Sequence, residues 1–374
     1  MRATLGTHRR ARRGAALAVV LVALVVVAAL GAGTALASRE LRRAAHDDLA
    51  RQRAESSAEG ALESALHPWD RRRSQLAVGA VDSTTGLAPG DVVRTVRIGP
   101  TWFLVEADAR AAAAAPGAAG WAERSVSALV HLRPPSIRAL AAITSGGPLT
   151  LLGNAAVDGH DATPSGWTDC IGPAADTAAV ATPGPLDVHA APQAFVSGAL
   201  LQHAATVDPS TYAAFGVDDW TSLAARADVA VAVTDGAHVP LPDAVGASCV
   251  LGAAAWSDPS RGAGAVSACA TTYPLVLARG GLALDGGRAQ GVLLVDGDLV
   301  LNGVVTFAGV IVVRGALHAD AGALHLDGAL LVSGGGALGA GSHVRFSRCA
   351  VARALDGVAR VGRIGRRSWA EVTR

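Results

Sequence analysis

Lysine is absent from this sequence, and aromatic residues are scarce. Phe, Trp and Tyr together supply 4% of the 374 residues, and charged residues supply 17%. The formal net charge of +1 gives no overall field that would attract nucleic acid. Because 51% of the residues are hydrophobic but few are aromatic, Ala, Val, Leu and Gly must do most of the packing. This composition favours closely stacked β-turns over a large aromatic-lined pocket.

Several motifs of catalysis and metal binding are also missing. The chain has no Walker A sequence, no GxSxG, no HExxH and no CxxC spacing. Its four cysteines are Cys170, Cys249, Cys269 and Cys349, all far beyond the apolar N-terminal segment. Their number and spread favour two structural disulfides in an oxidising compartment, with three possible connectivities. Buried free thiols are the alternative.

The N-terminus carries a basic cluster followed by a long apolar run. Five arginines and no acid lie in the first fourteen residues, and no charged residue occurs from Ala15 to Ala37. These 23 residues would form a helix of about 34 Å, enough to cross a hydrocarbon core of about 30 Å. The arginines should stay in the cytoplasm and the rest of the chain outside it. Cleavage after Ala35-Leu36-Ala37 by signal peptidase, giving a secreted protein, is the alternative.

Residues 38–66 predict that the apolar helix continues. This stretch is rich in helix formers, contains no proline and has Gly60 as its only glycine. A light apolar stripe runs through Leu41, Ala45 and Leu49 and, after a slip, through Ala54, Ala58, Leu62 and Ala65. Membrane segment and continuation would form one helix of about 78 Å over residues 15–66. Its outer half has only small side chains to bury, so we expect it to pack against another element.

These N-terminal residues resemble a known family. Arg12-Arg13-Gly14, the following AALAVVLVALVVVAAL and the AEGAL segment at 58–62 are similar to the N-terminus of PilX-like type IV pilus assembly proteins and minor pseudopilins. The resemblance implies that a prepilin peptidase cleaves after Gly14, leaves Ala15 as the mature N-terminus and retains the helix as an anchor. It also implies other pilin-like subunits as partners. The fifth mature residue is Val19, where major pilins carry glutamate, which indicates an accessory subunit.

The segment after the helix predicts a small antiparallel sheet. Residues 91–98 and 101–108 are β-rich and are separated by Gly99-Pro100, which is typical of a hairpin. Residues 125–132 predict a third strand. Such a sheet, packed on the helix, would form a pilin-like head.

A glycine-rich repeat predicts the C-terminal fold. Four similar segments begin at Leu275, Val292, Val310 and Ala329, and their equivalent glycines are Gly280, Gly297, Gly315 and Gly334, spaced by 17, 18 and 19 residues. Apolar runs that turn at glycine suit stacked coils of a β-solenoid, because one coil cannot bury its inner face alone. The segment from Ile143 has the same pattern and is expected to be the first coil. A similar glycine-bounded array occurs in PilX-like proteins, and an antiparallel β-sandwich is the alternative.

Four features could carry chemistry, but each has a structural explanation that we favour. Asp296 and Asp298 form a carboxylate pair around Gly297 and are expected to be turn residues. His318, His325 and His343 lack metal-ligand spacing and are expected to be solvated or core residues. GGGALG at 334–339 matches GxGxxG, but strand-like residues follow it, so a β-turn is expected. The basic tail is expected to be a solvated end. Its arginines are Arg360, Arg363, Arg366 and Arg367.

The sequence therefore predicts an α+β protein with a long N-terminal transmembrane and amphipathic helix, a small antiparallel sheet and a β-solenoid-like C-terminal domain. The expected segments are a basic leader (1–14), the helix (15–66), a pilin-like β region (67–140), a first β coil (141–164), an irregular insertion with cysteines (165–270), the Gly-rich β repeats (271–350) and a basic tail (351–374).

The predicted function is non-enzymatic. We expect a single-pass component of the cytoplasmic membrane, with an extracytoplasmic C-terminal domain, that serves a type IV pilus or a related secretion machine. Gly31, Ala32 and Gly33 would permit close helix packing against pilin-like subunits. No cofactor, metal or nucleic acid is expected. A β-solenoid that binds or cleaves polysaccharide and a surface adhesin are the alternatives.

Overall fold

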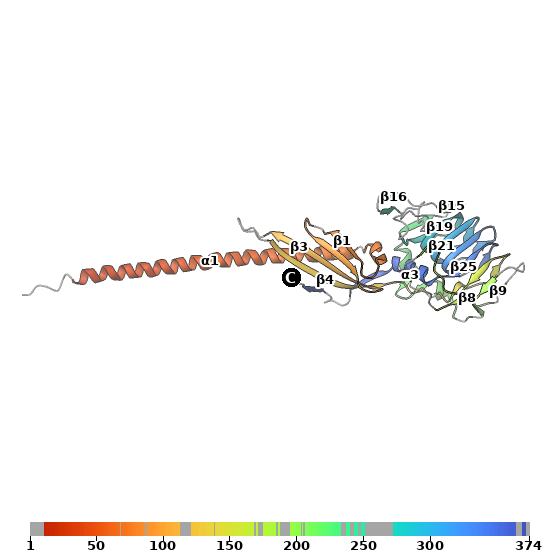
Figure 1. The fold of residues 1–374 in the computed structure, drawn as a ribbon, viewed down its shortest axis with the longest axis horizontal. Helices are drawn as coiled ribbons and strands as arrows, with labels where there is room; N and C mark the ends of the chain where they lie inside the picture. Colours follow the sequence, from red (N-terminus) through yellow and green to blue (C-terminus); the bar gives the residue numbers. More distant parts are fainter. Residues whose placement is uncertain are drawn as a thin grey trace, which may run out of the picture.

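The computed structural model has three parts in sequence: a long helix, a small antiparallel sheet, and a large curled sheet at the far end (Figure 1). The structure describes residues 11–67, 69–86, 88–112, 121–137, 139–167, 170, 175–184, 186–187, 195–202, 204, 206–232, 237–239, 243–245, 248–250, 272–363 and 369–371.

Helix α1 (Ala11–Leu66) is continuous over 56 residues and confirms the predicted helix. Its first part stands free of the rest of the chain, whereas its last turns pack on the small sheet (Figure 1). A 3-10 turn η1 (Arg71–Gln75) follows, capped by the Asp70 side chain, which accepts a hydrogen bond from the Arg72 backbone N–H.

The small sheet confirms the three predicted strands and adds others. It runs in the order β1-β2-β3-β4-β26, with β27 also paired to β4, and every pairing is antiparallel. Its strands are β1 (Val81–Thr85), β2 (Val92–Arg97), β3 (Trp102–Ala112), β4 (Trp121–Arg133), β26 (Arg360–Arg363) and β27 (Trp369–Glu371). Alternation along β2 and β3 buries one face, formed by residues such as Phe103, Val105 and Ala107, against α1.

The expectation of a solvated C-terminal tail is wrong for the described residues beyond 350. Helix α3 (Arg348–Gly357) covers part of the curled sheet, and β26 then pairs with β4 of the small sheet. Arg366 and Arg367 lie outside the described residues. The tail returns because its apolar residues Ala354 and Val358 are buried, which local charge patterning does not reveal.

The large sheet has seventeen described strands, and all of its described pairings are parallel. The antiparallel sandwich alternative is therefore wrong. The strands are β5 (Ala141–Ser145), β6 (Leu149–Leu151), β7 (Ala156–Asp158), β8 (Ala178–Thr182), β9 (Leu186–Asp187), β10 (Phe195–Ser197), β11 (Ala199–Gln202), β14 (Val229–Ala232), β15 (Ala237–Val239), β18 (Leu275–Arg279), β19 (Leu282–Val295), β20 (Leu299–Leu301), β21 (Val304–Val313), β22 (Leu317–Ala319), β23 (Ala323–Val332), β24 (Gly336–Leu338) and β25 (His343–Phe346).

Smaller elements complete the described fold. They are η2 (Pro209–Tyr212), the short helix α2 (Trp220–Ala224), and two hairpins formed by β12 (Ala214–Phe215) with β13 (Asp218–Asp219) and by β16 (Asp243–Val245) with β17 (Ser248–Val250).

The repeat register agrees with the sequence prediction. Leu275 pairs with Val292, Val292 with Val310 and Val310 with Ala329, so the four segments lie side by side. Their glycines form a column in which a Cβ added to Gly297 would meet the backbone of Gly280 at 2.7 Å. Glycine is needed there because the backbones of successive repeats approach so closely.

The order of the repeats differs from the prediction. The segment from Ile143 does not precede the Leu275 repeat in space but lies beside the last repeat, where Ile143 pairs with Leu330. Residues 165–270 are also not wholly irregular: β8 and β11 extend the sheet beyond β5, and β14 extends its other end beside β18. The apolar run of β8 is buried along its whole length and has no period, so it gave no strand pattern. Strand β11 is exposed, and β14 is too short to show a clear alternation.

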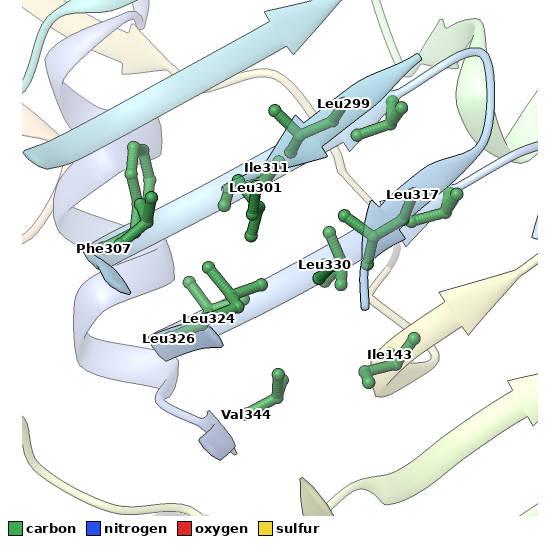
Figure 2. Packing of buried hydrophobic residues seen from close by; sticks show 14 of the residues in the cluster. Ile143, Leu299, Leu301, Phe307, Ile311, Leu317, Leu324, Leu326, Leu330 and Val344 are labelled. Carbon is green, nitrogen blue, oxygen red and sulfur yellow. The ribbon is translucent and has the colours of Figure 1, made fainter. Parts of the chain in front are cut away.

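The core of the curled sheet lies in its interior (Figure 2). Side chains including Leu299, Ile311, Leu324 and Leu330 pack together there from neighbouring strands. Alternate residues of the same repeats, such as Val310 and Val312, face a second core formed with Tyr212, Phe215, Trp220 and Ala354. Burial on both faces explains the continuous apolar runs of the repeats.

Candidate functional site

The exposed part of α1 is the candidate functional surface. Among the described residues, one helix is long and apolar enough to cross a membrane, and none of its apolar stretch is buried by the rest of the chain. Val19 is 68% exposed, and Ala37 is exposed as well. Gly14 and Ala15, the predicted processing residues, lie within the described helix.

The apolar span contains a close-packing surface. At Gly31 and Gly33, no heavy atom beyond the chain neighbours and the helix's own backbone lies within 4 Å of the position that a Cβ would occupy, and Ala32 between them is exposed. A neighbouring helix could therefore approach this backbone closely.

Between the span and the small sheet, α1 is polar and exposed. Arg43 pairs with Glu40 at 2.9 Å, and Arg51 pairs with Asp48 at 3.1 Å, both at i, i+3 spacing. Such exposed pairs contribute little to stability. The predicted stripe does not pack within the chain here, because Leu41 is 71% exposed. Burial of the helix begins only at Ala50.

The last four turns of α1 are attached to the small sheet by a stripe of small residues. Ala50, Ala54, Ala58 and Ala61 are each at most 1% exposed, so the sheet lies directly against the helix backbone. This confirms the outer part of the predicted stripe. The missing bulk of alanine is matched by larger side chains on the sheet, among them Phe103.

Polar contacts at two places hold the same part of α1. The Ser57 hydroxyl donates a 2.9 Å hydrogen bond to the carboxylate of Asp91, which also accepts from the Ala88 backbone N–H. At the helix end, Arg73 donates to the Ala65 carbonyl at 3.0 Å and forms an ion pair with Asp82. A cation at a helix C-terminus is stabilised by the helix dipole. The exposed part of α1 is thus continuous with a C-terminal part that is fixed to the small sheet.

One disulfide pair is present among the described cysteines. Cys170 and Cys349 are bonded, although they lie 179 positions apart in the sequence. This bond links the segment after β7 to the start of α3. Cys269 and the side chain of Cys249 lie outside the described residues, so their predicted pairing stays a prediction.

The candidate catalytic carboxylates lie at turns between repeats. Asp296 pairs with Arg314 at 2.7 Å, and Asp298 accepts a 2.7 Å hydrogen bond from the backbone N–H of Ala316 in the next repeat. Both interactions connect successive repeats. GGGALG forms strand β24 with its flanking turn and opens no helix.

The three predicted histidines separate into two places. His325 and His343 lie on adjacent strands with ring centroids 5.5 Å apart, whereas His318 lies on β22 near Asp298. Among the described residues, no three His, Cys, Asp or Glu side chains are grouped as metal ligands.

Sequence reasoning missed a cluster at the junction between the small sheet and the curled sheet. Asp218 has no exposed side-chain surface and pairs with Arg226 at 3.0 Å and Arg360 at 2.5 Å. An Asp-Asp-Trp turn in the sequence signals a helix cap, and Asp219 does cap α2. Nothing local signals that Asp218 also holds the returning strand β26.

Comparison with protein-family models, with curated proteins and with solved structures finds no match for this chain. Its functional interpretation therefore rests on its own residues and geometry.

Proposed function

We propose that this chain is a membrane-anchored, non-enzymatic structural or assembly component of a type IV pilus or a related secretion machine. The observation that carries the proposal is the single helix α1, which is exposed and apolar at its start and fixed to a β-sheet by residues 50–66. A continuous helix of this kind connects a membrane to an extracytoplasmic head without a flexible joint.

The orientation of the chain in the membrane follows from the positive charge of its N-terminal leader. The arginine-rich leader stays on the cytoplasmic side, and the head and curled sheet lie outside. Prepilin peptidase cleaves after Gly14, so that Ala15 becomes the mature N-terminus of a retained anchor. The disulfide between Cys170 and Cys349 fits the oxidising side of the membrane.

The partners are other pilin-like subunits, packed helix to helix. The surface around Gly31 and Gly33 is unobstructed, and small residues let helices approach closely within a membrane. Val19 takes the place of a carboxylate that would need a partner in the membrane. The chain is thus an accessory subunit rather than the bulk subunit of a filament.

The curled sheet is a β-solenoid in this proposal. Repeats of 17 to 19 residues in parallel register, with glycines stacked at the turns, support this assignment. A stiff stack of coils would display its outer faces at a distance from the membrane.

The decisive experiment determines the mature N-terminus by mass spectrometry of the protein from its membrane fraction. Ala15 is the expected first residue, and Gly14→Leu should abolish this processing. Gly33→Leu is the matched control, because it places the same side chain in the helix but away from the cleavage site. A chain beginning at Ser38, or an intact Met1, would refute the prepilin route.

A further inference from the structure

One outer face of the curled sheet forms an open groove that the anchoring function does not use. It has a volume of about 570 Å³ and crosses strands β21, β23, β25, β7 and β10. Its polar residues alternate along the strands with Leu324, Leu326 and Val344, whose side chains belong to the interior core (Figure 2), and Leu326 and Val344 also border the groove. The groove is therefore lined by the outward side chains of a rigid sheet.

The groove residues form two rows across the strands. One row runs from Thr306 through His325, His343 and Ala156 to Phe195. Neighbouring strands are about 4.8 Å apart, so the five strands extend about 19 Å. Three regularly spaced polar side chains followed by an aromatic one suit an extended chain molecule with a short repeat unit.

The second row holds charged side chains that are already paired. Asp327 forms an ion pair with Arg345 at 2.7 Å, and Asp158 contacts His160 at 2.7 Å. That contact raises the pKa of His160, first through its hydrogen bond with Asp158 and then through the charge of the same carboxylate. A paired carboxylate or guanidinium still has lone pairs or N–H groups that can bond the hydroxyls of a ligand.

The charge of the lining argues against a polyanion. Two carboxylates, Asp158 and Asp327, face one guanidinium, Arg345, so the lining has one net negative charge when its histidines are neutral. A peptide strand is disfavoured as well, because β23, β25 and β7 are paired on both sides and have no open backbone edge. Recognition must come from side chains.

The end of the groove provides an aromatic surface. Phe195 is 60% exposed beside Ala156, and the His325 and His343 rings lie further along the same row. Exposed rings cover the C–H faces of sugars, while imidazole, carboxylate and guanidinium groups bond their hydroxyls.

From this combination we infer that the groove binds a neutral glycan chain, lying across strands β21 to β10. The inference is independent of pilus assembly, since it concerns the face of the curled sheet and not α1.

The test measures binding of the full chain, purified in an amine-oxide detergent that carries no sugar, to immobilised neutral hexasaccharides. The probes are the β-1,4-linked glucose, β-1,4-linked N-acetylglucosamine and α-1,4-linked glucose hexamers, with polygalacturonate as the anionic comparison. The wild-type chain should bind at least one neutral hexamer more tightly than polygalacturonate.

Variants locate the site. The double variant His325→Ala/His343→Ala should lose about ten-fold or more in affinity, equivalent to about 1.4 kcal/mol. His318→Ala is the matched control, because it removes an exposed histidine from a different face, and it should bind as the wild type does. Phe195→Ala should weaken binding with no change in thermal unfolding, which separates a binding role from a structural one.

Absence of binding to every neutral hexamer would overturn the inference. Preference for polygalacturonate, or equal affinity of the double variant and His318→Ala, would overturn it too.

Discussion

Arg97 and Asp356 form an ion pair of 3.3 Å, although they lie 259 positions apart in the sequence. Arg97 ends β2 of the small sheet, and Asp356 lies in α3 on the curled sheet. Their side chains are only 8% and 17% exposed. A second connection lies nearby, where Gln75 donates to the Arg353 carbonyl and accepts from the Arg353 guanidinium. The helix-bearing head and the curled sheet are thus joined by buried polar contacts.

Replacing Arg97 by methionine should destabilise the protein by about 3–5 kcal/mol, because it leaves Asp356 buried without its partner. The carbonyls of Ser74 and Leu76 would also lose the Arg97 guanidinium as donor. The measurement is chemical unfolding of the full chain in detergent.

Arg94→Met is the matched control for this prediction. Arg94 lies on the same strand and pairs with Asp108 at 3.1 Å, but its side chain is 39% exposed. Asp108 would keep the hydrogen bond that it accepts from the Ser125 hydroxyl, so the loss should be below about 1 kcal/mol. If the two variants lower the free energy of unfolding equally, the ion pair at the junction stabilises the protein no more than the exposed pair does.

The buried carboxyl of Asp356 should make the stability of the protein depend on pH. Burial raises the pKa of its carboxyl above the ordinary value of 3.8, and the Arg97 charge offsets only part of this rise. Because the folded state holds the proton more tightly than the unfolded state, the stability from this group is present below the unfolded pKa. It is lost as pH rises through the folded pKa.

Asp356→Asn removes this titration. The thermal stability of the variant should therefore decline less than that of the wild type as pH rises above the ordinary value of 3.8 and through the raised pKa of Asp356. Parallel curves for wild type and variant over that range would contradict the assignment.

The sequence predicted the elements that depend on local periodicity or on repetition. Helix formers from Ala15 to Leu66 predicted α1, and glycine spacing placed Gly280 beside Gly297 in the correct register. The order of the repeats in space was not predictable, because the segment from Ile143 can stack on either end of the array with the same local pattern.

The contacts between the small sheet and the curled sheet could not be predicted from the sequence either. Arg97 and Asp356 become partners only when β26 returns to β4, and this return depends on long-range burial rather than on local signals. Part of the groove could be predicted, because His325 and His343 stand close together in the sequence. Their alignment with Thr306 and Phe195 became known only from the strand register.

The disulfide between Cys170 and Cys349 should contribute about 2–5 kcal/mol, because it closes a long loop in the unfolded chain. Cys349→Ser should lower the free energy of unfolding by this amount, and Cys170→Ser/Cys349→Ser should lower it no further. Peptide mass spectrometry without reduction should recover the two segments linked. Recovery of Cys170 joined to another cysteine would contradict the structure.

Gly309 provides the sharpest test of the stacked repeats. It pairs with Gly291 on one side and Gly328 on the other, and its φ of 135° is unfavourable for any residue with a side chain. A Cβ at this position would lie 2.1 Å from the Gly291 carbonyl oxygen and 3.1 Å from the Ala354 Cβ of α3. Gly309→Ala must therefore separate two repeats or displace the helix that covers them, and it should cost about 2–4 kcal/mol in urea unfolding.

Gly281→Ala is the comparison that separates this close approach from the general cost of changing a glycine. The nearest atom to a Cβ at Gly281 is the Asp298 carbonyl oxygen at 3.4 Å, an ordinary contact distance, and its backbone does not have the positive φ of Gly309. Its replacement should change stability by less than about 1 kcal/mol. If both variants unfold at the same urea concentration, the repeats are not stacked as closely as their register requires. Since a rigid stack is what places the two rows of the groove in line, the same result would also remove the physical basis for an ordered glycan site.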